Sequence, residues 1–300
     1  MTSRRQFLAA SAAATLAQAA SLDTVRLGVT TDEIDDDVDT ALRFHSEFGL
    51  KWCEMRNIWG KYNTAQPLDR IREAKGLLDK HAIKLSILGT GFFKIPLPPD
   101  NAEGRAILDN QWSLLDTAME RAKILGTERI RTFAFTYKDG ALPDPKAYGR
   151  IWELVTESAR RAKARGFRLA VENVGSSYVW SGAEAGRLLK HVKADNLGLT
   201  WDPNNAGQTG EKSFPEGYAA LDPARIFHVH LRDFRKDASG KWEWCAVGEG
   251  VMDNLGQIRR LLKDGYKGNF TLETHYKSPQ GKTHASRTSL TALLQVVERV

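Results

Sequence analysis

The sequence FHVHLRD at residues 227–233 alternates apolar and polar residues, which predicts a buried strand. Because successive side chains of a strand point to opposite faces, His228, His230 and Arg232 share one face. Three further stretches have the same design, and each carries a possible metal ligand near its end: LAVEN at 169–173, LGLTWD at 197–202 and FTLE at 270–273. The four stretches therefore predict four related strands of one sheet.

Residue parity places one candidate ligand of each strand on the face opposite the large apolar residues: Glu172, Asp202, His230 and Glu273. In a barrel wrapped by helices, the large residues face the helices and the other set lines the interior. The four side chains are then expected to converge at the C-terminal mouth, where barrel enzymes carry out their chemistry.

The rest of the chain alternates strand-like and helix-like stretches, which is typical of βα units around a parallel sheet. We expect the other strands at 25–31, 51–58, 83–88 and 129–136. We expect helical connections at 38–48, from 67 onward, and at 105–125, 146–165, 183–192, 222–225, 255–262 and 286–299. This α/β pattern predicts a single-domain (β/α)8 TIM barrel. The acidic stretch 32–39 stands before the first helix, where the helix dipole favours acids.

The N-terminus predicts an export signal. Arg4 and Arg5 precede an Ala-rich run, and Ala17-Gln18-Ala19 matches a small-residue cleavage site. We expect a twin-arginine (Tat) signal peptide at 1–20, a barrel at 21–300, and a periplasmic or otherwise exported mature protein. No later stretch is apolar enough to span a membrane, so no membrane anchor is expected.

Charge and cysteine content exclude some classes of partner. The formal net charge is +6 and includes Arg4 and Arg5, so the remainder is small for 300 residues and no nucleic-acid partner is expected. The periplasm would permit a disulfide, but two cysteines make no framework, and free thiols are expected for Cys53 and Cys245. The sequence leaves open whether the chain is a monomer or a homo-oligomer.

Three carboxylates and one imidazole make an oxygen-rich site for one divalent metal ion. Mn²⁺ is the first expectation, with Mg²⁺, Co²⁺ or Zn²⁺ as alternatives. The carboxylates exceed the charge of a dication by one, which favours a neutral, chelating substrate such as a hydroxy-ketone. The metal would stabilise an enediolate, while Glu172 and Glu273 remove and return a proton on the two faces of the substrate.

The motifs Val-Glu-Asn, Trp-Asp-Pro-Asn-Asn, His-Val-His-Leu-Arg-Asp, Gly-Glu-Gly and Leu-Glu-Thr follow one another along the chain. Because of these motifs, residues 25 to about 276 resemble the sugar phosphate isomerase/epimerase superfamily of xylose isomerase-like barrels. The resemblance to its ketose 3-epimerases implies a ligand set of Glu172, Asp202, His230 and Glu273. It also implies that the second histidine of the His-x-His pair is the ligand and that the two glutamates act as acid and base.

Three further residues are candidates for binding the substrate: Glu54, Asn205 and Arg232. Asn205 stands where many members have a histidine, and Arg232 where many have a lysine, so the identity of the sugar stays open. Glu54 could bind a substrate hydroxyl or pair with Arg56, and Arg232 could hold a substrate oxygen or pair with Asp233. The ends of the second and third strands lack the histidine ligands of members with endonuclease activity, which argues against a nuclease.

These residues predict a divalent-metal-dependent isomerase or epimerase of a small-molecule carbohydrate. The same acid, base and metal would serve a lyase or dehydratase acting on a keto-sugar or 3-keto-glycoside. A non-catalytic periplasmic sugar-binding barrel is the alternative from another class, and the four intact ligand positions argue against it. Aromatic residues of the predicted mouth loops could stack on a sugar or pack a lid: Trp59, Tyr62, Phe92, Phe93, Trp180, Trp242 and Trp244. His275 shares a face with Glu273 but comes late, and is not included in the site.

Overall fold

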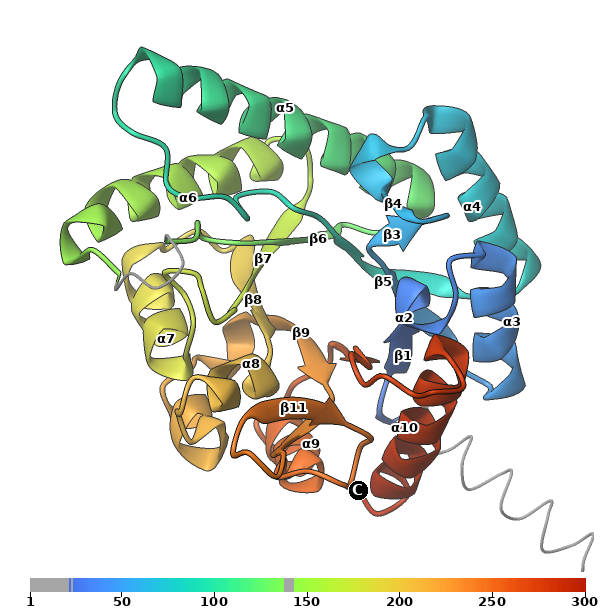
Figure 1. Ribbon diagram of the computed structural model, residues 1–300. Helices are drawn as coiled ribbons and strands as arrows, with labels where there is room; N and C mark the ends of the chain where they lie inside the picture. The colour runs from blue at the N-terminus through green and yellow to red at the C-terminus, as the bar shows by residue number, and fades with distance from the viewer. Residues whose placement is uncertain (1–21, 23, 138–142) are drawn as a thin grey trace, which may run out of the picture.

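The computed structural model of the chain describes residues 22, 24–137 and 143–300. Eight parallel strands close into a barrel in the order β1-β12-β9-β8-β7-β6-β5-β2, and helices surround it (Figure 1). The barrel strands are β1 (Leu27–Thr30), β2 (Trp52–Met55), β5 (Lys84–Gly89), β6 (Arg129–Thr132), β7 (Arg168–Glu172), β8 (Leu197–Trp201), β9 (Ile226–Leu231) and β12 (Asn269–Leu272). The predicted TIM barrel is thereby confirmed, while the predicted signal peptide at 1–20 lies outside the described residues.

The outer layer consists of helices that pack an apolar face on the strands. They are α3 (Val38–Glu47), α4 (Leu68–Lys80), α5 (Ala102–Leu125), α6 (Tyr148–Lys163), α7 (Gly182–His191), α9 (Asn254–Lys263) and α10 (Lys282–Val297). The short helices α2 (Thr31–Ile34) and α8 (Pro203–Gln208) instead follow β1 and β8 at the C-terminal mouth of the barrel (Figure 1). Asp37 caps α3 by accepting a hydrogen bond from Thr40 N. Gly126 ends α5 with φ of 86°, a left-handed conformation that glycine adopts without strain.

Two short antiparallel hairpins stand outside the barrel, where the sequence predicted longer barrel strands. The expected strand 51–58 ends at Met55, and β3 (Asn57–Ile58) pairs with β4 (Lys61–Tyr62). The expected strand 227–233 ends at Leu231, and β10 (Asp233–Lys236) pairs with β11 (Trp242–Cys245). The connection between β8 and β9 contains α8 and a 3-10 helix, Pro223–Arg225, at the position of the predicted short helix.

A bulge in β9 changes the predicted alternation at one position. Leu199 pairs with Ile226 and Thr200 with His228, so Phe227 is the extra residue. Phe227 packs with the buried side chains of Ile87 and Ala170 instead of joining the main core between barrel and helices. The bulge therefore lets both Phe227 and His228 occupy the interior, where strict alternation would allow one of them.

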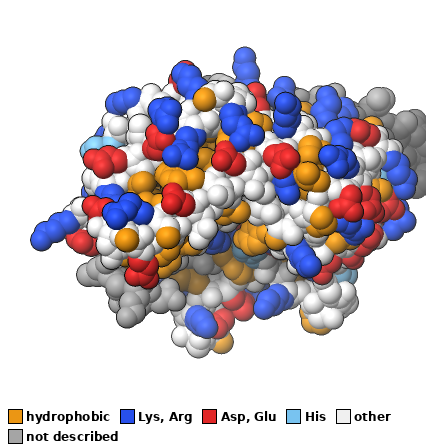
Figure 2. Space-filling view, turned by 90° about the horizontal axis from the view of Figure 1, so that it is seen from above, with side chains coloured by type: hydrophobic (Ala, Val, Ile, Leu, Met, Phe, Trp, Pro, Cys, Tyr) orange, Lys and Arg blue, Asp and Glu red, His pale blue; other side chains and the backbone are white. Residues whose placement is uncertain are grey.

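The surface mixes charges of both signs. On the face in Figure 2, acidic side chains lie among the basic ones. Within the described residues, no helix is long and apolar enough to cross a membrane. Cys53 and Cys245 are buried free thiols, as predicted.

Candidate metal centre

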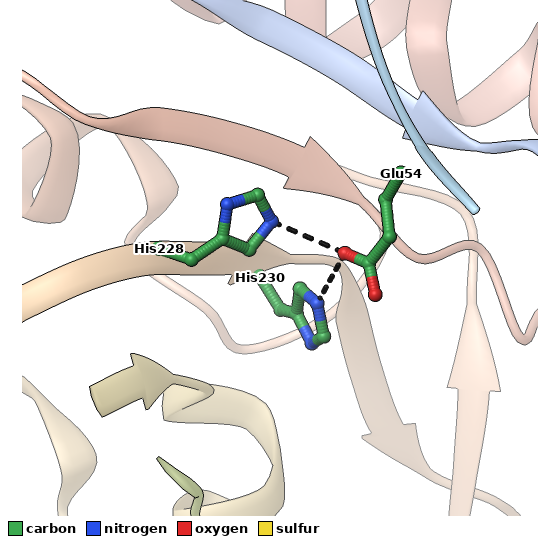
Figure 3. Close-up of side chains that lie close together, drawn as sticks. All are labelled: Glu54, His228 and His230. Carbon is green, nitrogen blue, oxygen red and sulfur yellow. Dashed lines mark hydrogen bonds and ion pairs between the residues drawn. The ribbon is translucent and has the colours of Figure 1, made fainter. Parts of the chain in front are cut away.

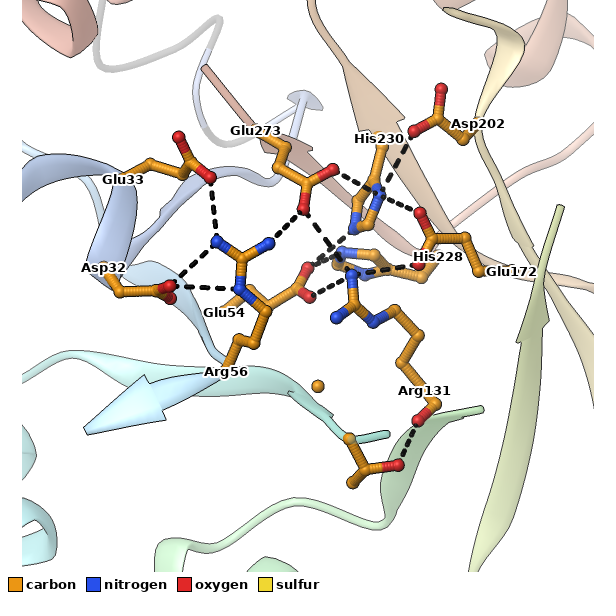
Figure 4. A network of polar contacts seen from close by, with 12 residues as sticks. Asp32, Glu33, Glu54, Arg56, Arg131, Glu172, Asp202, His228, His230 and Glu273 are labelled. Atoms are coloured by element: carbon orange, nitrogen blue, oxygen red, sulfur yellow. Dashed lines mark hydrogen bonds and ion pairs between the residues drawn. The ribbon is translucent and has the colours of Figure 1, made fainter. Parts of the chain in front are cut away.

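The four predicted ligands meet at the C-terminal ends of four neighbouring strands. Nδ1 of His230 lies 3.5 Å from Glu172 Oε1, 3.6 Å from Asp202 Oδ2 and 3.4 Å from Glu273 Oε2, and all four side chains are buried (Figure 4). These separations are long for hydrogen bonds, and Nδ1 of His230 has no hydrogen-bond partner among the described residues. Ligand atoms about 2.1 Å from a metal ion lie about 3.4 Å apart at the corners of a tetrahedron. The cluster therefore has the spacing of a coordination shell and could hold a metal ion.

The orientation of His230 is fixed by Glu54 at the end of β2. Oε2 of Glu54 lies 2.9 Å from Nε2 of His230 and 3.1 Å from Nε2 of His228 (Figure 3). The carboxylate of Glu54 accepts a hydrogen bond from the N–H of each of these nitrogens, so Nδ1 of His230, on the other side of the ring, faces the three other carboxylates. Glu54 is fully buried, and its predicted contact with a substrate hydroxyl stays a prediction. Arg56, the other partner considered from the sequence, pairs with different acids.

Three arginines, Arg131, Arg56 and Arg232, are buried or half-buried and neutralise part of this acidic cluster. Arg131 and Arg56 are described first. Nη1 of Arg131, from β6, lies 3.0 Å from Glu172, 3.5 Å from Glu54 and 3.6 Å from Glu273. Arg56 bridges Glu273 to the two acids of α2, with its guanidinium 2.9 Å from Glu273 and 2.8 Å from both Asp32 and Glu33 (Figure 4). Arg131, Asp32 and Glu33 were not predicted from the sequence as residues of the site.

Arg232 lies between two of the candidate metal ligands. Its Nη2 contacts Asp202 and its Nη1 lies 2.8 Å from Glu273, so it pairs with these acids and not with Asp233. Asp233 instead accepts backbone hydrogen bonds from the loop at 248–252. Asn205 accepts from Arg232 at 3.0 Å and donates to Glu172 at 3.3 Å. Both candidate substrate-binding residues therefore touch the metal ligands, and their contact with a substrate stays a prediction.

His275, which was not predicted as part of the site, lies beside the cluster. Its Nδ1 is 2.6 Å from Nη1 of Arg232, and its Nε2 is 3.3 Å from Glu33 and 3.5 Å from Glu273. Its φ of 46° turns the chain back towards the barrel directly after β12. This turn brings His275, which lies beyond the end of β12, to the mouth of the site.

The predicted mouth aromatics divide between the site and the core. Trp244 packs edge-on against His275, with ring centroids 5.3 Å apart, and lies 4.3 Å from the guanidinium of Arg232. Phe92 and Phe93 are fully buried and stack on each other at 3.9 Å. These two rings therefore support a loop and are not exposed to a ligand.

Burial and neighbouring charges set the protonation of the cluster. Burial lowers the pKa of His228, whereas at His230 the same effect is outweighed by Glu54 and Glu273, which raise its pKa well above the usual value. Burial raises the pKa of Glu172, but Arg131 and His230 outweigh it and hold the pKa below the usual value. Because a metal ligand must be deprotonated, an ion entering this cluster displaces the proton that His230 attracts.

Comparison with known proteins identifies both a matching family and similar structures. Residues 42–295 match the family described as xylose isomerase-like TIM barrel. No curated protein matches the chain.

Three solved structures are similar over most of the chain. A xylose isomerase-like TIM barrel protein from Mycobacterium smegmatis, in complex with magnesium, is 20% identical with a TM-score of 0.66, covering 87% of this chain and 88% of that one. The IOLI protein with a zinc atom is 19% identical with a TM-score of 0.73, covering 91% and 98%. D-psicose 3-epimerase from Clostridium cellulolyticum H10, with D-tagatose, is 17% identical with a TM-score of 0.66, covering 91% and 94%. At these identities the similarity demonstrates a shared fold.

Proposed function

Because the chain belongs to the xylose isomerase-like TIM barrel family, we propose that it is a divalent-metal-dependent isomerase or epimerase of a sugar or keto-sugar. The observation that carries the proposal is the buried Nδ1 of His230, which has no hydrogen-bond partner in the part of the chain that the structure describes and faces three carboxylate oxygens at 3.4–3.6 Å. A hydrogen-bonded structural cluster would satisfy that nitrogen, whereas a metal site leaves it free for the ion.

The metal is proposed to be Mn²⁺, with Mg²⁺, Co²⁺ or Zn²⁺ as alternatives, held by Glu172, Asp202, His230 and Glu273. Carboxylate oxygens and one imidazole suit these ions better than ions that prefer thiolates. When bound, the ion supplies Lewis-acid stabilisation for the negative charge that develops on the substrate oxygens. The magnesium and zinc ions of two similar structures support a divalent ion.

The proton transfers are assigned to the two glutamates. Glu172 is the last residue of β7, and Glu273 directly follows β12. These strands lie three apart in the closed order, so the two carboxylates approach a bound molecule from different sides. One takes the proton from the carbon beside the carbonyl, and the other, in its protonated form, donates its own proton to the same carbon or its neighbour. Asn205 and Arg232, which touch these ligands, are proposed to hold substrate oxygens.

The proposed location is the periplasm, reached through the Tat route. The support is the sequence of residues 1–20, with Arg4 and Arg5 before an Ala-rich run. A fusion of residues 1–25 to a reporter that is active only after export tests the location. Export should be lost when both arginines are replaced by lysine, and a reporter exported equally well without them would contradict it.

The enzymatic proposal is tested by hydrogen exchange from solvent into a keto-sugar. The Mn²⁺-loaded protein, incubated in D₂O with D-fructose, D-psicose or D-tagatose, should introduce deuterium beside the carbonyl of one of them, as NMR would show. The Glu172→Gln variant should be impaired, and the Glu157→Gln variant, at a half-exposed position on α6, should match the wild type. Loss of water or of an aglycone from a 3-keto-glycoside would instead identify a lyase. Binding with neither reaction would favour a sugar-binding barrel.

A further inference from the structure

His228, the first histidine of the His-x-His pair, is a buried residue beside the site that has no part in the proposed mechanism. It lies on β9 two residues before His230, and the two rings are 5.4 Å apart with their planes at 89°. The ring of His230 stands between the other three candidate ligands and Glu54. Among the described residues, the ring of His228 finds a hydrogen-bond partner on its Glu54 side and none at Nδ1.

Glu54 meets the two histidines across the interior of the barrel. Strands β2 and β9 lie three apart in the closed order, so this contact is made by side chains and not by neighbouring backbones. Oε2 of Glu54 is 2.9 Å from Nε2 of His230 and 3.1 Å from Nε2 of His228 (Figure 3). An ionised carboxylate only accepts hydrogen bonds, so each Nε2 carries a hydrogen and donates it to the same oxygen. Two nearly perpendicular rings therefore hold one oxygen of Glu54.

The backbone departs from regular strand pairing at both ends of this contact. In β9, the bulge at Phe227 directly precedes His228. Between β2 and β5, the register shifts between Cys53 and Glu54, which leaves Ser86 of β5 as the extra residue. Irregularities of this kind redirect a side chain and are frequent beside active sites. The two strands are thus shaped locally at the residues that bring Glu54 and His228 together.

A second partner for Glu54 lies close by, and His228 acts against it. Oε1 of Glu54 has no hydrogen-bond partner in the described part of the chain and lies 3.5 Å from Nη1 of Arg131. Without the N–H of His228, the carboxylate would gain a charge-assisted hydrogen bond by turning towards the guanidinium. That rotation would take Oε2 away from Nε2 of His230. The donor on His228 therefore keeps Glu54 in the position that orients His230.

We propose that His228 is a positioning residue of the metal centre: it fixes Glu54, and Glu54 fixes the ring of His230 with Nδ1 towards the other three ligands. This inference rests on the proposed metal-dependent function and adds a residue that acts on the ion through two others. Hydrogen bonds to a ligating imidazole set its orientation, and their loss weakens metal binding. The competing possibility is that Glu54, His228 and His230 hold a second ion themselves. His230 would then have to bind metal through both of its nitrogens.

The test is Mn²⁺ binding by calorimetry, with three variants that differ in where they place a donor. His228→Gln puts an amide N–H close to the position of Nε2, His228→Asn puts it close to that of Nδ1, and His228→Leu supplies none. Binding should be about ten-fold or more weaker in His228→Leu and His228→Asn, and close to the wild type in His228→Gln. The visible absorption of the Co²⁺-loaded protein, which depends on ligand geometry, should change and recover in the same pattern.

Thr271→Val is the matched control. Thr271 lies two residues before Glu273, as His228 does before His230, and it is also fully buried. Its hydroxyl has no hydrogen-bond partner among the described residues, so this variant should bind Mn²⁺ as the wild type does. Circular dichroism checks that each variant is folded, and the comparison of His228→Asn with His228→Gln decides the question if His228→Leu does not fold.

Equal binding by the wild type and His228→Leu, or binding by His228→Gln that is no tighter than by His228→Asn, would overturn the inference. Two ions per chain in the wild type, one of them lost in His228→Leu, would make His228 a ligand and overturn it as well. A wild type that binds no ion would refute the metal centre together with the role of His228. A wild type that binds Mn²⁺ in the predicted pattern but exchanges no hydrogen with a keto-sugar would refute only the isomerase function.

Discussion

Replacing Arg131 by methionine should destabilise the metal-free protein more than the metal-loaded protein. The guanidinium is buried and lies 3.0–3.6 Å from Glu54, Glu172 and Glu273. Methionine keeps most of the volume but leaves three buried carboxylates without this cation. Removing one partner of a buried ionic cluster costs about 3–5 kcal/mol. At about 2–3 °C per kcal/mol for a protein of this size, the melting temperature should fall by roughly 6–15 °C.

Thermal unfolding in EDTA and in excess Mn²⁺ measures the effect. Mn²⁺ should restore part of the lost stability, because the dication compensates the same carboxylates. Arg160→Met is the control, since this exposed arginine pairs with Glu157 on the surface of α6, away from the acidic cluster, and the melting temperature of this variant should stay close to that of the wild type. If the melting temperature of Arg131→Met in EDTA is less than about 2 °C below that of the wild type, the idea that Arg131 balances the buried acids is refuted.

Three other residues give independent predictions. Glu54→Gln should bind Mn²⁺ about 10-fold to 100-fold more weakly in a titration, because His230 loses its orienting carboxylate; an unchanged Kd would rule out that role. Glu172→Gln, assayed with saturating Mn²⁺, should slow deuterium exchange by about 100-fold or more, with a smaller effect on KM; exchange at the wild-type rate would exclude Glu172 as acid or base. Burial lowers the pKa of His45 below 6.5, so the unfolded chain takes up a proton near that pH and the folded chain does not. Stability should be complete above pH 6.5 and fall below it by up to about 1.4 kcal/mol per pH unit. Denaturant unfolding at pH 7.5 and 5.5 should show a smaller loss in His45→Gln, and an equal loss would contradict the assignment.

The barrel and the four candidate ligands could be predicted because both follow from side-chain alternation. A strand between a helical layer and an interior repeats every two residues, so parity placed Glu172, Asp202, His230 and Glu273 on one surface. The structure brings these four together with their ligand atoms within 4.8 Å of one another. Phe227 breaks the pattern, because a bulge depends on the register with the neighbouring strand, which is a property of two segments.

The supporting charges were harder to find because each has a common local explanation. Asp32 and Glu33 precede a helix, where the dipole alone would favour them, yet they pair with Arg56. Arg131 did carry a signal: a charged residue between Ile130 and Thr132, inside a barrel strand, has to face the interior if it does not face the apolar helical layer. His275 carried none, since the turn that brings it to the site arises only once β12 has ended.

The central claim is that the four ligands hold a metal ion, and metal content tests it most directly. The purified protein, reconstituted with Mn²⁺, Co²⁺, Mg²⁺ or Zn²⁺ and freed of excess ion, should contain about one divalent ion per chain. The His230→Ala and Glu273→Gln variants should lose or weaken that binding while remaining folded by circular dichroism. A wild type that retains none of the four ions, or variants that retain the ion as well as the wild type, would contradict the account.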